Sequence, residues 1–173
     1  PFPKENRRIL IGSDVSSRYT RRNRAEYRKI AGYIARCVWQ RQGNYMVFFP
    51  SYRLMEDVLQ VYEEEFSVDW VRCVCQTPDM TEQEREGTLV GFCVLGGIFS
   101  EGVDLTGESL IGAVIVGTGL PQIGSHREIL KEYYDKKNHC GFDYAYRYPG
   151  MNKVLQAAGR VIRTKEDKGV ILL

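Results

Sequence analysis

The sequence contains neither a long apolar run nor an apolar leader at its start. A helix that crosses a bilayer needs about 20 consecutive apolar residues, and no stretch of the 173 residues approaches that length. The first eight residues (PFPKENRR) lack the apolar core of a secretory signal peptide. These absences argue against a membrane partner and predict a cytosolic protein.

Cysteine and histidine are too few and too scattered to indicate a metal centre or a nucleophilic catalytic set. The five cysteines are an odd number and lie mostly in apolar runs: Cys37, Cys73, Cys75, Cys93 and Cys140. One residue separates Cys73 from Cys75, whereas metal knuckles use two to four. The only histidines, His126 and His139, stand in separate segments. We therefore expect reduced, buried thiols, histidines that are structural or at the surface, and no metal site.

The sequence also lacks the machinery that holds a nucleoside triphosphate. Residues 112–119 (GAVIVGTG) have the glycine spacing of a P-loop, but Thr118 stands where the phosphate-binding lysine belongs. The segment also lies mostly inside an apolar run, and no acidic Mg²⁺-binding motif follows an apolar strand. The chain by itself is therefore at most half of an ATPase.

What the sequence does contain is an alternation of apolar strands and amphipathic helices. Strands are predicted at residues 8–11, 45–49, 71–76, 89–95, 110–116 and 169–173, and helices at 25–42, from Ser51 as N-cap to about 62, at 125–137 and at 151–163. This order predicts one α/β domain over residues 1–173, with a mainly parallel sheet flanked by helices. The polar segment 78–87 is short for a parallel crossover, which predicts residues missing from the numbered chain near 84–88.

Positive charge is concentrated in the first quarter of the chain. The net charge is only +2, yet residues 1–42 carry eleven Lys and Arg against three Asp and Glu. Tyr19, Tyr27 and Tyr33 lie among these arginines, a mixture suited to phosphate contacts and base stacking. The segment indicates a nucleic-acid face, and a simply solvated basic surface is the alternative.

The segment 156–163 (QAAGRVIR) combines one amide with two arginines. On the predicted helix, Gln156, Arg160 and Arg163 follow at i, i+4 and i+7 and share a face, so that two guanidinium groups are offered to one anion. The planar guanidinium fork fits phosphate oxygens. The alternative is an amphipathic surface helix with solvated arginines.

Four segments, which together span nearly the whole chain, resemble the C-terminal helicase domain of DinG/XPD-like superfamily 2 helicases, most of all the bacterial DinG-type proteins. Residues 47–52 (VFFPSY) resemble motif IV, 97–105 (GIFSEGVDL) motif V, 119–121 (GLP) a loop typical of the family, and 156–163 motif VI. Motifs V and VI in this order are highly specific.

The resemblance implies a RecA-like, three-layer fold that serves as the second of two motor domains. It also implies ATP-driven movement along single-stranded DNA with 5′ to 3′ polarity. Arg160 and Arg163 match the arginine fingers that reach the γ-phosphate across the interdomain cleft, and Gln156 matches a position that couples the nucleotide to their helix. The matched nucleotide-binding positions are Glu101, Gly102, Asp104 and Gly159, and those on the DNA-binding side are Ser51, Tyr52 and Ser100.

The first motor domain, with its P-loop and DEAH-type box, is missing from the sequence. The resemblance therefore implies that ATP and Mg²⁺ are bound mainly by that domain, as the partner of this chain in a bacterial cytoplasmic parent. Many relatives hold an iron–sulfur cluster in the first domain, and none of the five cysteines matches that set.

Alone, the chain is expected to be an inactive monomer whose Arg160 and Arg163 are exposed or paired with local carboxylates. A second hypothesis, a stand-alone nucleic-acid-binding module without ATPase activity, remains open.

Overall fold

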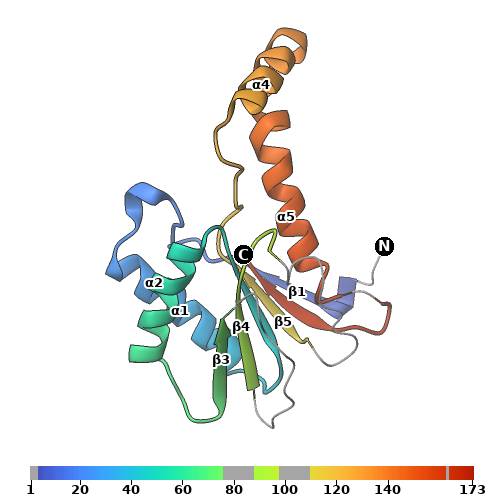
Figure 1. The fold of residues 1–173 in the computed structure, drawn as a ribbon. Coiled ribbons are helices and arrows are strands. Elements are labelled where there is room, and N and C mark those ends of the chain that lie inside the picture. The colour runs from blue at the N-terminus through green and yellow to red at the C-terminus, as the bar shows by residue number, and fades with distance from the viewer. Residues whose placement is uncertain (1–3, 76–87, 98–109, 163) are drawn as a thin grey trace.

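The computed structural model describes residues 4–75, 88–97, 110–162 and 164–173 (Figure 1). In these ranges the main elements are β1 (Arg7–Leu10), α1 (Arg24–Val38), β2 (Tyr45–Phe49), α2 (Tyr52–Glu65), β3 (Val71–Cys75), β4 (Thr88–Val94), β5 (Gly112–Ile115), α4 (Ser125–Asn138), α5 (Tyr148–Ala158) and β6 (Gly169–Leu172). A π-helical turn, Asp143–Arg147, leads directly into α5.

The strands form one six-stranded sheet in the order β1-β6-β5-β2-β4-β3. Every pairing in it is parallel. β2 is buried at every position, as expected for a strand covered on both faces. The predicted α/β domain with a parallel sheet is therefore confirmed. The predicted gap in numbering near 84–88 lies outside the described residues and stays a prediction.

Helices α1 and α2 cover one face of the sheet and form the first core (Figure 1). Tyr45, Val47 and Phe49 of β2 point to this face, where Phe49 stacks on Phe92 of β4 at 5.8 Å between ring centroids. Each helix begins with a side-chain cap, because Asn23 accepts from the amide of Glu26 and Ser51 accepts from the amide of Leu54.

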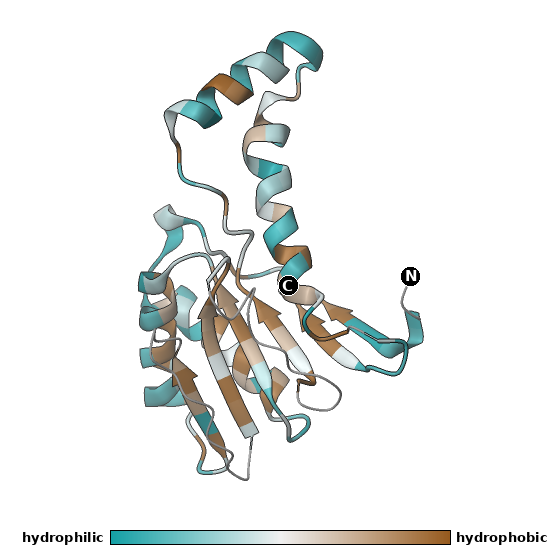
Figure 2. Cartoon of the chain, turned by 45° about the vertical axis from the view of Figure 1, so that its right-hand side comes forward, coloured by the Kyte–Doolittle hydropathy of each residue, from teal (hydrophilic) through white to brown (hydrophobic). Residues whose placement is uncertain are grey.

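The opposite face carries the smaller second core, which is covered by the end of α5 and the turn after it. Met46 and Phe48 of β2 point to this side and join Val154 and Ala157 of α5. Figure 2 shows that the strands are mostly hydrophobic, whereas the helices carry many hydrophilic residues. Helices on both faces complete the three layers that were predicted.

Helix α4 and the outer half of α5 project away from the sheet as a helical arm (Figure 1). No residue of α4 is buried. The arm is held by the stacked rings of Tyr134 and Tyr144, 3.9 Å apart, by Arg127 Nη1 donating to the Ala145 carbonyl at 2.8 Å, and by the Tyr146 hydroxyl donating to Glu128.

Two predicted features differ in the structure. The helix expected at 151–163 runs instead from Tyr148 to Ala158, because the chain turns at Gly159 so that the adjacent Val161 and Ile162 can both enter the second core. The aromatic stretch 142–149, for which no element was predicted, is mostly helical.

Among the described residues, no helix is long and apolar enough to cross a membrane. The same part of the chain has no group of His, Cys, Asp or Glu side chains arranged to hold a metal ion. All five cysteines are free thiols, and only Cys93 is fully buried.

Candidate functional site at the carboxyl edge of the sheet

Ligands of open α/β sheets bind beyond the carboxyl ends of the strands, where this chain gathers several predicted site residues. Ser51 and Tyr52 follow β2, Gly96 and Gly97 follow β4, and residues 117–121 follow β5. Because the strands are parallel and neighbouring, these segments share one edge of the molecule. The fold therefore brings the motif IV segment and the Gly-Leu-Pro loop to the same edge.

Ser51 has a structural task as well as its predicted role. It is the N-cap of α2, and its Oγ accepts a hydrogen bond from the Leu54 amide at 3.4 Å. The hydroxyl hydrogen is still able to donate. Tyr52 begins α2 with an exposed ring. A ligand at this edge would therefore meet a hydroxyl donor, an aromatic ring and the amino end of a helix.

Helix α5 connects this edge to the second core. At its outer half, a side chain on Gly150 would meet the Thr118 carbonyl oxygen at 3.2 Å and Leu120 at 3.0 Å, so the helix contacts the loop after β5 closely. Lys153, one turn further, lies beside Gly96, with its Nζ 3.7 Å from the position of a Cβ there. Displacement of either loop would therefore be transmitted to α5.

Gln156, Gly159 and Arg160 lie where α5 ends. Gln156 is exposed on the last helical turn, Gly159 is the C-cap, and Arg160 is half-buried in the turn that follows. The Arg160 amide donates to the Ala157 carbonyl at 3.2 Å. The expected helical face shared by Gln156, Arg160 and Arg163 is wrong, since Arg160 no longer belongs to the helix. The structure brings Gln156 and Arg160 to one helix end.

Several predicted site residues lie outside the described part of the chain. They are Ser100, Glu101, Gly102 and Asp104 of the motif V segment, and Arg163 of the motif VI segment. The roles expected for these five residues stay predictions.

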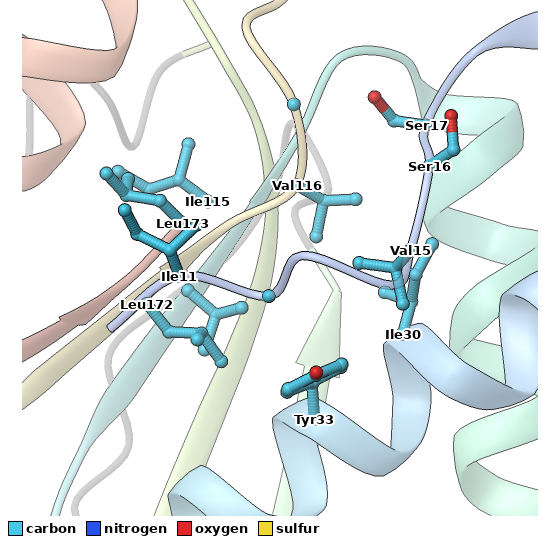
Figure 3. Close-up of a pocket in the computed structure, with 13 residues that line it drawn as sticks. Ile11, Val15, Ser16, Ser17, Ile30, Tyr33, Ile115, Val116, Leu172 and Leu173 are labelled. Atoms are coloured by element: carbon cyan, nitrogen blue, oxygen red, sulfur yellow. The ribbon is translucent and has the colours of Figure 1, made fainter. Parts of the chain in front are cut away.

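A small pocket of about 210 Å³ opens at the same edge, between the loop after β1 and the end of β5 (Figure 3). Ile11, Val15, Val116 and Leu173 give it apolar walls, and Ser17 stands at its border. No lysine or arginine is among its lining residues. It therefore offers no cationic side chain to a phosphate, in keeping with the structural interpretation of the glycines at 112–119.

The loop beside this pocket is fixed by two carboxylates. Buried Glu26 accepts from the Ser16 amide at 2.9 Å and from Arg21 Nη2 at 3.1 Å. The Tyr33 hydroxyl donates to Asp14 Oδ1 at 2.5 Å. This hydrogen bond lowers the pKa of the Asp14 carboxyl and raises the pKa of the Tyr33 phenol. The loop is thus held in place rather than free to close over a ligand.

Sequence reasoning overlooked Lys153 as a candidate. Its ammonium group is the cation beside the loop after β4, immediately before the motif V segment. The signal was available, because Lys153 stands three residues before Gln156 on the same helix. The loop that Lys153 lies beside, however, could not be identified from the sequence, because the two segments come together only in the folded structure.

Comparison with known proteins places this geometry in context. The family described as helicase C-terminal domain matches residues 34–173. The ATP-dependent DNA helicase XPD of Sulfolobus acidocaldarius is 30% identical over 169 residues, which cover 91% of this chain and 29% of the relative. A probable ATP-dependent helicase of Methanocaldococcus jannaschii is 28% identical over 192 residues, covering 100% of this chain and 29% of the relative.

Solved structures give the same assignment of fold. One XPD helicase structure has a TM-score of 0.78 at 24% identity and covers 96% of this chain and 31% of that one. An apo XPD structure has a TM-score of 0.76 at 26% identity and covers 95% and 34%. The domain is therefore RecA-like, and the chain spans about 29% of the length of the two curated relatives.

Proposed function

The chain belongs to the helicase C-terminal domain family of DinG/XPD-type superfamily 2 helicases, and on this premise we propose that it is the second motor domain of an ATP-dependent DNA helicase. The observation that carries the proposal is the placement of α5. Its outer half contacts the loops after β4 and β5, and its inner end bears Gln156 and leads to Arg160. A strand-binding edge and a nucleotide-sensing segment are thereby joined by one rigid element.

In this proposal, Arg160 and Arg163 are arginine fingers for a nucleotide held mainly by the first motor domain. Two guanidinium groups near the γ-phosphate stabilise the charge that develops in the transition state, and such a finger is worth about 10³ to 10⁵ in rate. Gln156 and Gly159 position this segment, and Glu101, Gly102 and Asp104 report nucleotide state to the DNA side. When bound, ATP and Mg²⁺ supply the phosphoryl chemistry, and this chain supplies charge stabilisation and coupling.

Single-stranded DNA is the proposed track, with Ser51, Tyr52 and Ser100 as contacts and movement from 5′ to 3′. The half-buried Ser51 hydroxyl and the exposed Tyr52 ring suit a sugar–phosphate contact and a stacked base. The partner is the first RecA-like domain, without which this chain is inactive. A DinG-like bacterial cytoplasmic parent and an iron–sulfur cluster elsewhere in it remain predictions.

The test is alanine substitution in the full-length protein that contains this domain. Arg163→Ala and Arg160→Ala should each reduce DNA-stimulated ATP hydrolysis by about 10³-fold or more, with ATP binding largely intact. Arg72→Ala is the matched control, because Arg72 is an exposed arginine on the far edge strand β3. Unaltered turnover in the Arg163 and Arg160 variants, or an equal loss in the control, would contradict the proposed role.

The stand-alone nucleic-acid-binding module is the second candidate, and the concentration of arginines in residues 1–42 favours it. ATP hydrolysis by the full-length protein decides between the two, because a binding module has no turnover to lose. Tight, sub-micromolar binding of DNA by the 173 residues alone would favour the module.

A further inference from the structure

A second concave surface runs from the amino edge of the sheet along β1 and β6, and Ile11, Tyr33 and Leu172 line both it and the small pocket. This amino-edge groove has a volume of about 920 Å³ and is bordered by the start of β1, the end of α1 and the start of β6. Its lining cations are Lys4, Arg7, Arg8, Arg36, Arg41 and Lys168. Glu5 is the one carboxylate among the lining residues, so the groove has a strong positive bias.

The cations come from separate elements that the fold brings together. Arg8 is paired in register with Val170, which places its side chain on the α1 side of the sheet, and Arg7 is paired with Gly169, directly after Lys168. Arg36 stands in the last turn of α1, on the opposite wall. Positive charges thus border the groove on both sides.

The residues that border the groove near β1 and β6 are held by hydrogen bonds. Asn6 Nδ2 donates to the Lys165 carbonyl at 2.6 Å, tying the turn before β1 to the turn before β6. In the latter turn the Thr164 amide donates to Asp167 Oδ2 at 2.7 Å. Lys168 is therefore presented from a fixed position beside Arg7 and Arg8.

The cations on the strand side are not neutralised within the fold. Across the described residues, no ion pair joins Arg7, Arg8 or Lys168 to a carboxylate, whereas Arg24 and Arg28 on the outer side of α1 pair with Glu64 and Glu65. Arg36 lies 4.9 Å from the centroid of the Tyr33 ring, which keeps its guanidinium at the groove wall. Asp14, which accepts a hydrogen bond from Tyr33, interacts electrostatically with Arg36.

We propose that the amino-edge groove binds the sugar–phosphate backbone of a nucleic-acid strand, as a second contact in addition to the predicted contacts Ser51, Tyr52 and Ser100. Evenly spaced phosphates complement Arg7, Arg8 and Lys168, which pair with no carboxylate of the described residues. The inference takes only the class of ligand from the proposed function. Loss of this contact would leave the arginine-finger chemistry unchanged, so the two proposals fail separately.

The test is binding of fluorescent oligonucleotides to the 173-residue chain by anisotropy, at several salt concentrations. The double variant Arg8→Glu with Lys168→Glu should weaken binding of a single-stranded 20-mer at least about tenfold and lower the salt slope by about 1.4, since each contact to a single strand contributes about 0.7. The matched control is Lys136→Glu with Lys137→Glu, the same charge change on exposed positions of α4. It should alter affinity less than about twofold.

A measurement on the unsubstituted protein guards against misfolded variants. Lysine acetylation, followed by mass spectrometry, should show Lys4 and Lys168 protected by the oligonucleotide and Lys136 and Lys137 unprotected. Parallel titrations with a 20-bp duplex and an RNA 20-mer identify which strand the groove prefers. The proposal is overturned by equal effects of the two double variants, by absence of lysine protection, or by polyglutamate of matched charge competing as well as DNA.

Discussion

Burial in the sheet core suppresses the acidity of several thiols. Desolvation raises the pKa of Cys93 to about 12, of Cys73 to about 12 and of Cys37 to about 11, from an ordinary value of 9.0. At pH 8 a thiol of pKa 12 is ionised to only ~10⁻⁴, so it is a poor nucleophile and a poor metal ligand. The free thiols therefore act as small apolar side chains.

The raised thiol pKa values predict a loss of stability at high pH. Below pH 9 the thiols are neutral in both states, whereas above it the unfolded chain ionises and the folded chain does not. The free energy of unfolding should therefore fall as pH rises from about 9 towards about 12. Urea unfolding at pH 8 and pH 10.5 measures the decline. In Cys93→Val, which removes an ionisable group from the core, the decline should be shallower. An identical decline would contradict burial of the Cys93 thiol as a cause.

At the residue scale, features that depend on adjacent residues could be predicted from the sequence. Features that depend on contacts with distant residues could not. Ser51 was predicted as an N-cap because a hydroxyl follows Pro50 and precedes a periodic apolar run, and the structure confirms it. Arg160 was placed on a helix because its spacing from Gln156 is helical. The helix ends earlier because Val161 must pack against Gly169, where a Cβ would lie 2.1 Å from Val161 Cγ1. That contact joins residues far enough apart in sequence to escape periodicity.

At the scale of elements, the helical arm depends on one glycine between α4 and the turn that leads into α5. Gly141 is buried, and a Cβ on it would lie 2.1 Å from the Lys131 carbonyl oxygen and 2.5 Å from the Asp135 carboxyl. Its amide donates to Asp135 Oδ1 at 2.8 Å. Only glycine fits this turn, which brings the aromatic rings of the two helices together.

Gly141→Ala should therefore loosen the arm while the sheet remains folded. Overpacking costs about 1–3 kcal/mol, and this cost falls on an arm whose helix α4 buries no residue. Limited proteolysis should show faster cleavage between residues 125 and 147, with little change in the main thermal transition.

Gly124→Ala is the control, because nothing lies within 4 Å of a Cβ there at the other end of α4. Equal protease resistance of both variants and the parent would show that the close approach at Gly141 does not hold the arm.

The arm also shows what element prediction could not supply. The periodicity of α4 was predictable. In the structure its Ile129 is 69% exposed and none of its residues is buried. The aromatic stretch 142–149 lacks helical apolar spacing, and its helix forms through contacts with α4 such as Tyr144 on Tyr134. Apolar periodicity predicts that a helix has an apolar face, but it does not predict whether another part of the chain covers that face.

At the scale of the whole molecule, two cores of unequal size share one sheet. β2 is hydrogen-bonded on both sides, to β4 and β5, and contributes side chains to both cores. The layer order and parallel sheet followed from the alternation of apolar strands and amphipathic helices. The strand order could not be predicted from this alternation, because it depends on contacts between segments far apart in the chain.

Amide hydrogen exchange should differ between the central strand of the sheet and the helical arm. Amides of β2 should open only with global unfolding, whereas amides of α4 should exchange through local opening, orders of magnitude faster. Native-state exchange at low denaturant, read by NMR or mass spectrometry, distinguishes the two. Equal protection of α4 and β2 would mean that the arm is part of the cooperative core.

The site was predictable in proportion to how local its motifs are. Motifs IV and VI were identified by resemblance from short strings, and the roles expected for Ser51 and Gln156 stay predictions. The contact of α5 with the loops after β4 and β5, through Gly150 and Lys153, joins segments whose proximity no sequence spacing encodes. The cations of the amino-edge groove are likewise dispersed from Lys4 to Lys168.

The two edge strands have a further consequence for the protein in concentrated solution. Among the described residues, β1 and β3 are each paired with one strand, so each offers unpaired backbone groups to a strand of another molecule. Both edges carry exposed arginines, Arg7 and Arg8 on β1 and Arg72 on β3, and like charges resist strand addition between copies. Arg7 and Arg8, which line the groove, thus also limit aggregation. Substitutions that reverse their charge should preserve this protection, whereas neutral substitutions should remove it.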